Sequence, residues 1–78
     1  MLRFEVIENT KERVSYRYFP ENQEQSGVIS VKKSDKTIVE QTIASNDEFK
    51  WCFFKLFKRI KEYIDADQYE SSGIIAWY

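Results

Sequence analysis

The chain has 78 residues, of which 42% are hydrophobic and 17% are aromatic. This length supports one hydrophobic core, so we expect residues 1–78 to form a single domain. Twelve Lys and Arg residues against 13 Asp and Glu residues give a formal charge of -1, which excludes a protein drawn to nucleic acid by its overall field. Histidine is absent, which excludes Ser-His and Cys-His nucleophile pairs and His-ligated metal sites.

Cysteine and glycine are also scarce. Cys52 is the only cysteine, so no intramolecular disulfide can form, and we expect a cytoplasmic protein. The two glycines are too few for a phosphate-cradling loop, which disfavours nucleotide-dependent chemistry. No apolar run approaches the length of a signal or membrane segment, so we expect no membrane partner. We predict a protein that is not an enzyme and holds no cofactor or metal.

Two segments near the N-terminus alternate apolar and polar residues. They cover residues 2–8 and 13–18, and polar residues separate them. A period of two is typical of strands with one buried face, so these segments predict a hairpin whose Leu2, Phe4 and Val6 side chains face the core. Pro20 ends the second strand because it lacks a backbone donor, and Gly27 closes the loop that follows.

Residues 28–33 and 37–44 are rich in β-branched side chains and predict a second hairpin. Residues 71–73 then read as a turn, and the apolar residues 74–78 predict a fifth, buried strand. We place Ile7, Val28 and Ile38 on the outward face of the sheet.

A capping box predicts the start of a helix. Ser45 and Glu48 have the spacing at which a hydroxyl and a carboxylate each satisfy a backbone amide of the first turn. Beyond them, apolar residues recur at steps of three and four, which predicts a helix from about Asp47 to about Ile64. The apolar face contains Phe49, Cys52, Phe53, Leu56, Phe57, Ile60, Tyr63 and Ile64. Cys52 is expected there as a small, protonated core residue.

These elements predict an α+β fold in the order ββββαβ: an antiparallel sheet of four to five strands with one long amphipathic helix packed on one face. Two segments, Tyr18-Phe19-Pro20-Glu21 and Gly73-Ile74-Ile75-Ala76-Trp77-Tyr78, resemble those of small uncharacterised bacterial proteins of similar length. The resemblance implies that one domain spans the chain, and it implies no function.

Two large rings fall on the charged side of the predicted helix. Trp51 and Phe54 lie opposite the apolar face, among several lysines. Either the C-terminal segment covers these rings, or they contact a partner, because exposed apolar clusters tend to mark contact sites. The favoured interpretation is a non-catalytic protein-interaction module that self-associates or docks on another protein. Trp51, Phe54 and Lys58 form its binding surface, and the rings lie at the centre of a twofold interface.

A second interpretation is a domain that binds single-stranded nucleic acid through the outer face of the sheet. The bases Arg3, Arg13, Arg17 and Lys32 could follow a phosphate backbone while Phe19 stacks on a base. Glu5 and Glu40, expected on the same face, and the slightly negative net charge oppose this alternative.

Overall fold

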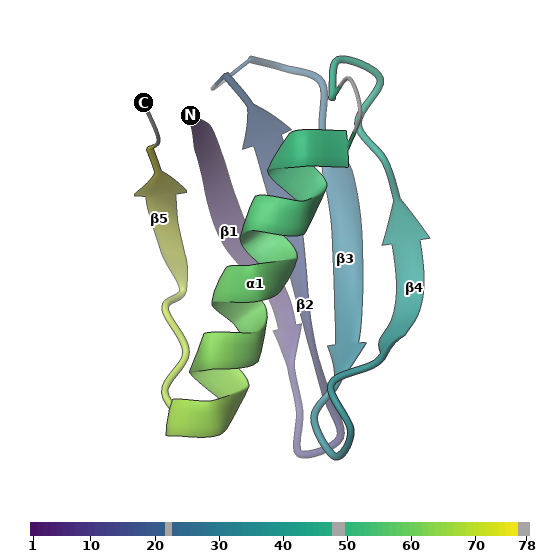
Figure 1. The fold of residues 1–78 in the computed structure, drawn as a ribbon, viewed down its shortest axis with the longest axis vertical. Coiled ribbons are helices and arrows are strands. Elements are labelled where there is room, and N and C mark those ends of the chain that lie inside the picture. The colour runs from purple at the N-terminus through teal and green to yellow at the C-terminus, as the bar shows by residue number, and fades with distance from the viewer. Residues whose placement is uncertain (22, 48–49, 77–78) are drawn as a thin grey trace.

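The computed structural model describes residues 1–21, 23–47 and 50–76. Within them, five strands form one sheet in the order β4-β3-β2-β1-β5, and all neighbouring strands are antiparallel. A single helix, α1 (Trp51–Ala66), follows the fourth strand (Figure 1). The fold is therefore the α+β arrangement in the order ββββαβ that the sequence predicts. The strands are β1 (Leu2–Asn9), β2 (Arg13–Pro20), β3 (Gly27–Lys32), β4 (Ile38–Thr42) and β5 (Ser72–Ile75).

The chain passes from one edge of the sheet to the other through α1. β4 and β5 are the edge strands, and α1 crosses one face of the sheet between them, as Figure 1 shows. No other helix or strand of the described residues covers the opposite face. We call the two faces the helix face and the outer face.

Apolar side chains of the sheet and of the helix pack between the two layers of the fold. Alternation places them on one face of each strand, and the helical period places them on one side of α1. The predicted inward positions Leu2, Phe4, Val14, Tyr16 and Tyr18 are almost completely buried, and Val6 packs at the margin of the core. Burying large rings compensates for the short length of the chain, because each removes much apolar area from water. The core also contains Ile29, Val31, Ala44, Cys52, Phe53, Leu56, Ile60 and Ile75.

Two bulges interrupt the ladders. The register of β1 against β2 shifts between Val6 and Glu8, which leaves Ile7 as the extra residue, and Ile7 is exposed. The register of β4 against β3 shifts in the same way around Val39. An extra residue reverses the inside-outside alternation beyond it. The expectation that Ile38 faces outward is therefore wrong, and Ile38 packs against the core instead.

The helix begins later than the capping box predicts. Its first residue is Trp51, and Ser45 gives it no cap. Instead Asp47 Oδ1 and Oδ2 accept hydrogen bonds of 2.9 Å from the backbone N–H groups of Cys52 and Phe53. A carboxylate satisfies these amides better than a hydroxyl because it opposes the positive end of the helix dipole. Glu48, the other member of the predicted box, and Phe49 lie outside the described residues.

Two contacts stabilise the C-terminal end of α1, and one of them comes from the turn between β3 and β4. Asp67 adopts a left-handed conformation (φ 51°) just after the helix, and its N–H donates to the carbonyl of Ile64. Lys36, in the turn between β3 and β4, forms an ion pair with Asp65. This contact offsets the unfavourable position of an acidic residue at the negative end of the helix dipole.

The glycines lie in strands and not in the expected turns. Gly27 begins β3 opposite Tyr18, and Gly73 lies in β5 opposite Phe4. A Cβ atom on Gly73 would stand 2.8 Å from Cζ of Phe4, and one on Gly27 would meet the Tyr18 ring and the carbonyl oxygen of Thr42. Both positions exclude a side chain because a core ring occupies its space. Trp77 and Tyr78, predicted to end the fifth strand, lie outside the described residues.

Candidate interaction surface

The solvent-facing side of α1 forms one stripe, which we call the helix stripe. Its members recur at steps of three and four, and all are exposed. They are Trp51, Phe54, Lys55, Lys58, Glu62 and Asp65. Trp51 is 61% exposed and Phe54 is 55% exposed. Residues 67–76, the described part of the C-terminal segment, therefore leave both rings more than half exposed.

A contact with the core holds the Phe54 ring in place. The Phe54 ring packs edge-on against Phe53, with centroids 5.6 Å apart, and Phe53 in turn packs against Tyr18 at 6.3 Å. Phe53 and Tyr18 are buried. Asp47 adds rigidity because it binds two amides of the first helical turn and also accepts a hydrogen bond from the Tyr18 hydroxyl (3.1 Å). The rings therefore project from a fixed first turn, which lowers the entropy cost of binding.

Basic side chains surround the rings. Lys50, Lys55 and Lys58 are exposed. Lys58 lies one turn beyond Phe54 on the same stripe, so its aliphatic stem can lie along the ring. Lys61, on the flank of the helix, places its Nζ 4.5 Å from the centroid of the Phe57 ring. The surface thus combines aromatic area with positive charge.

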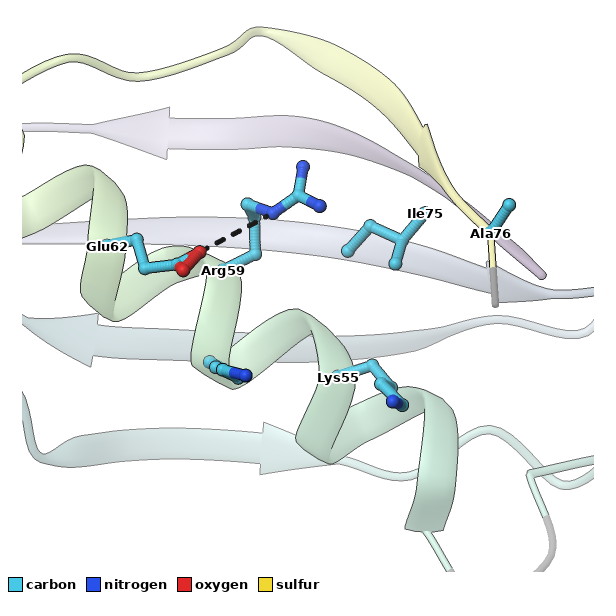
Figure 2. Close-up of a pocket in the computed structure, with 6 residues that line it drawn as sticks. Lys55, Arg59, Glu62, Ile75 and Ala76 are labelled. Atoms are coloured by element: carbon cyan, nitrogen blue, oxygen red, sulfur yellow. Dashed lines mark ion pairs between the residues drawn. The ribbon is translucent and has the colours of Figure 1, made fainter. Parts of the chain in front are cut away.

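A groove runs beside the stripe, between α1 and the end of β5. Figure 2 shows Lys55 and Arg59 on the helix facing Ile75 and Ala76 across it. The groove has a volume of about 280 Å³, and Lys58 and Glu62 complete its lining. Arg59 Nε lies 3.8 Å from Glu62 Oε1, an ion pair between consecutive turns. The groove is open to solvent and half of its lining residues are basic, unlike the enclosed and mostly apolar pockets that bind small ligands.

The residues of the nucleic-acid alternative come together on the outer face. Arg3 lies directly opposite Phe19, and Arg13 directly opposite Lys32. Arg17 is opposite Glu5 in the neighbouring strand. The sheet therefore collects the five predicted residues on one face.

Contacts within that face occupy most of these groups. The Arg3 guanidinium lies 3.9 Å from the centroid of Phe19, and one of its nitrogens lies 3.6 Å from Glu5 Oε2. Arg13 Nε donates to Glu8 Oε1 at 2.8 Å. Arg3 therefore covers one face of the Phe19 ring, and Glu8 pairs with Arg13. The geometry thus disfavours the outer face as a backbone-following site.

The outer face also contains a feature that the sequence analysis missed. Ser15 and Ser30 are opposite each other on β2 and β3, both are buried, and their hydroxyl oxygens are 2.6 Å apart. They lie at the floor of a hollow of about 390 Å³. Two serines in neighbouring predicted strands were the only signal in the sequence. One hydroxyl donates to the other, so both oxygens take part in a hydrogen bond within the sheet.

The buried ionisable groups serve the fold. Tyr18 Oη accepts a hydrogen bond from the Ala44 N–H (3.1 Å), and burial raises the pKa of Tyr18 above its ordinary value. Burial likewise raises the pKa of the Cys52 thiol to about 11, and the nearby Asp47 carboxylate adds to the shift. A thiol with this pKa is almost entirely protonated at neutral pH, which makes it a poor nucleophile.

Among residues 1–21, 23–47 and 50–76, no cluster of Cys, Asp and Glu side chains could hold a metal ion. In the same ranges, α1 is neither long enough nor apolar enough to cross a membrane.

Comparison with known proteins adds no information about function. A scan against protein-family models, a search of curated proteins and a search of solved structures each gave no match to this chain. The resemblance of residues 18–21 and 73–78 to small bacterial proteins therefore stays a prediction.

Proposed function

We propose that this chain is a non-catalytic protein-interaction module that binds a second copy of itself through Trp51, Phe54 and Lys58. The observation that supports the proposal best is the exposure of two adjacent large rings on a well-ordered helix. Aromatic residues of this kind are enriched in the buried parts of protein interfaces. In water the same pair is an aggregation liability.

The remaining features agree with a binding role in the cytoplasm. The buried Asp47 carboxylate is occupied in capping the helix and bridging it to Tyr18 of the sheet, which supports a structural role for it. The single cysteine is buried and unpaired, as suits a reducing compartment. These observations support the proposed setting and do not test it.

Sedimentation velocity over a wide concentration range tests the proposal. We expect the wild type to be a dimer at high concentration and the variant with Trp51→Glu and Phe54→Glu to be a monomer, because two unpaired carboxylates cannot be buried in the contact. Both residues are exposed, so the double variant should keep its fold, which circular dichroism would check.

Ile74→Glu is the matched control. Ile74 is 60% exposed, close to the value for Trp51, but it lies in β5 and pairs with Arg3, which places it on the outer face. This variant should dimerise as the wild type does. A wild type that stays monomeric at about 1 mM, or equal loss of the dimer in the variant and the control, would overturn the proposal.

A further inference from the structure

Charge is divided along α1 and the segment that follows it. Residues 50–61 contain five basic residues and no acidic one, whereas residues 62–70 contain four acidic residues and no basic one. The basic set is Lys50, Lys55, Lys58, Arg59 and Lys61, and the acidic set is Glu62, Asp65, Asp67 and Glu70. The helix stripe therefore changes from basic at its aromatic end to acidic at its last turn.

This division bears on how two copies can meet. A twofold axis through Trp51 and Phe54 would bring Lys50, Lys55 and Lys58 of both copies together, and like charges in an interface are costly. A twofold axis perpendicular to the helix and near its middle instead overlaps the two antiparallel helices along most of their length. The basic part of each then faces the acidic end of the other, which satisfies both sets at once.

We infer that two copies of this chain pair through antiparallel α1 helices, with Lys55 and Lys58 of each facing Glu62 and Asp65 of the other. The inference rests on the proposed function and specifies its geometry. Phe54 would then lie over Ala66 of the second copy, a small exposed residue that leaves room for a ring. The aromatic residues form two contacts at the ends of the interface.

The acidic residues remain available for this pairing. Glu62 and Asp65 are more than half exposed at their side chains despite their contacts with Arg59 and Lys36. Each carboxylate has two oxygens, so a second cation can bind alongside the first. A 16-residue helix is about 24 Å long, so the interface belongs to the small, weak class. The dimer should be studied between about 10 µM and about 1 mM.

A charge-swap series measured by sedimentation tests the antiparallel geometry. The double variant Glu62→Lys with Asp65→Lys makes the whole stripe basic, and Lys55→Glu with Lys58→Glu makes it acidic. We expect each to raise the dissociation constant about tenfold or more. The variant with all four substitutions reverses the charges and restores complementarity, so its dissociation constant should return to within about threefold of the wild type. It is also the folding control, because it contains every substitution.

Disulfide trapping gives a second measurement with milder substitutions. In a Cys52→Ala background, a mixture of the Lys58→Cys and Glu62→Cys proteins should form a mixed disulfide under oxidation. Phe54→Cys alone should not cross-link to itself, although it would do so if the rings met at the twofold axis.

The outcomes separate the two proposals. A wild-type dimer that the Glu62→Lys, Asp65→Lys variant leaves unchanged, together with self-linked Phe54→Cys, would overturn the antiparallel geometry and leave the interaction module standing. A monomeric wild type would overturn both.

Discussion

Asp47 connects the sheet to the helix through a single buried carboxylate. It accepts two amide hydrogen bonds from the first turn of α1 and one hydroxyl hydrogen bond from Tyr18. The sequence pattern pointed to Ser45 because a serine and a glutamate at the right spacing precede an apolar stripe. It could not show that residue 47 would be buried beside a tyrosine from β2, which depends on how the sheet and the helix pack.

Replacing Asp47 with Ala should therefore lower the free energy of unfolding by about 2–3 kcal/mol, because two helix amides and a buried hydroxyl lose their acceptor. Ser45→Ala should change it by less than about 0.5 kcal/mol, since Ser45 is exposed and gives α1 no side-chain cap. Urea unfolding followed by circular dichroism measures both. If both variants lost the same free energy of unfolding, Ser45 would have to cap the helix as the sequence predicts.

Tyr16 and Tyr18 make stability sensitive to alkaline pH. Burial, the largest cause for each, raises the pKa of both hydroxyls above the ordinary value of about 10. Above pH 10 the unfolded chain loses these protons while the folded chain keeps them. Below about pH 9.5 these two tyrosines should leave the free energy of unfolding unchanged. Above pH 10 the free energy of unfolding should fall by up to about 1.4 kcal/mol per pH unit for each tyrosine.

Urea unfolding between pH 8 and pH 11.5 measures this dependence. Tyr16→Phe should be less stable than the wild type near pH 8, because it removes the 2.7 Å hydrogen bond to the Glu70 carbonyl, but its alkaline slope should be shallower. A slope equal to that of the wild type would show that Tyr16 does not titrate in this way.

The hydrophobic period of the sequence predicted the strands and the helix, but it did not predict the bulges in the strands. Alternation in residues 2–8 and 13–18 predicted which side chains of the first hairpin face the core, and the apolar stripe predicted the buried face of α1. The bulges at Ile7 and Val39 left no mark in the pattern, because one extra residue changes the face of those beyond it without changing their composition. Ile38 was misplaced for this reason.

The positions of the two glycines could not be predicted from the sequence either, because each is required by an aromatic ring on the neighbouring strand. Gly27→Ala should be strongly destabilising, by about 3 kcal/mol or more, because the new methyl group meets the Tyr18 ring and the fixed carbonyl of Thr42. Gly73→Ala should cost less, about 1–2 kcal/mol, because only the Phe4 ring must move, and β5 is an edge strand. Thermal unfolding would rank the two variants. The reverse order would contradict this packing.

At the scale of the whole molecule, the sequence predicted on which face of the fold the exposed groups lie. It did not predict which of these groups contact one another. Helical spacing alone put Trp51 and Phe54 on the side away from the core. The stacking of Arg3 on Phe19 and the pairing of Arg13 with Glu8 depend on the register of β1 against β2, which no single strand reveals. The charge division between residues 50–61 and 62–70 was readable from the sequence, but its meaning required knowing that one stripe is exposed.

The fold also predicts an order of local opening. β2 lies at the centre of the sheet beneath α1, whereas β4 is an edge strand with a bulge and mostly exposed side chains. Local unfolding costs least where few apolar contacts must break. Native-state amide hydrogen exchange should therefore be fastest in β4 among the strands and slowest in β2 and the buried turns of α1.

β5 provides the internal comparison. It is also an edge strand, but Ile75 is buried in the core and Val6 donates to the carbonyl of Ser71 beside it (2.7 Å). Its hydrogen-bonded amides should exchange more slowly than those of β4, and Ile75→Ala should remove most of that difference by deleting the apolar contact that holds the strand. If β4 were instead protected like β2, its edge would have to be covered in solution, and the contact between copies would include the sheet as well as the helix.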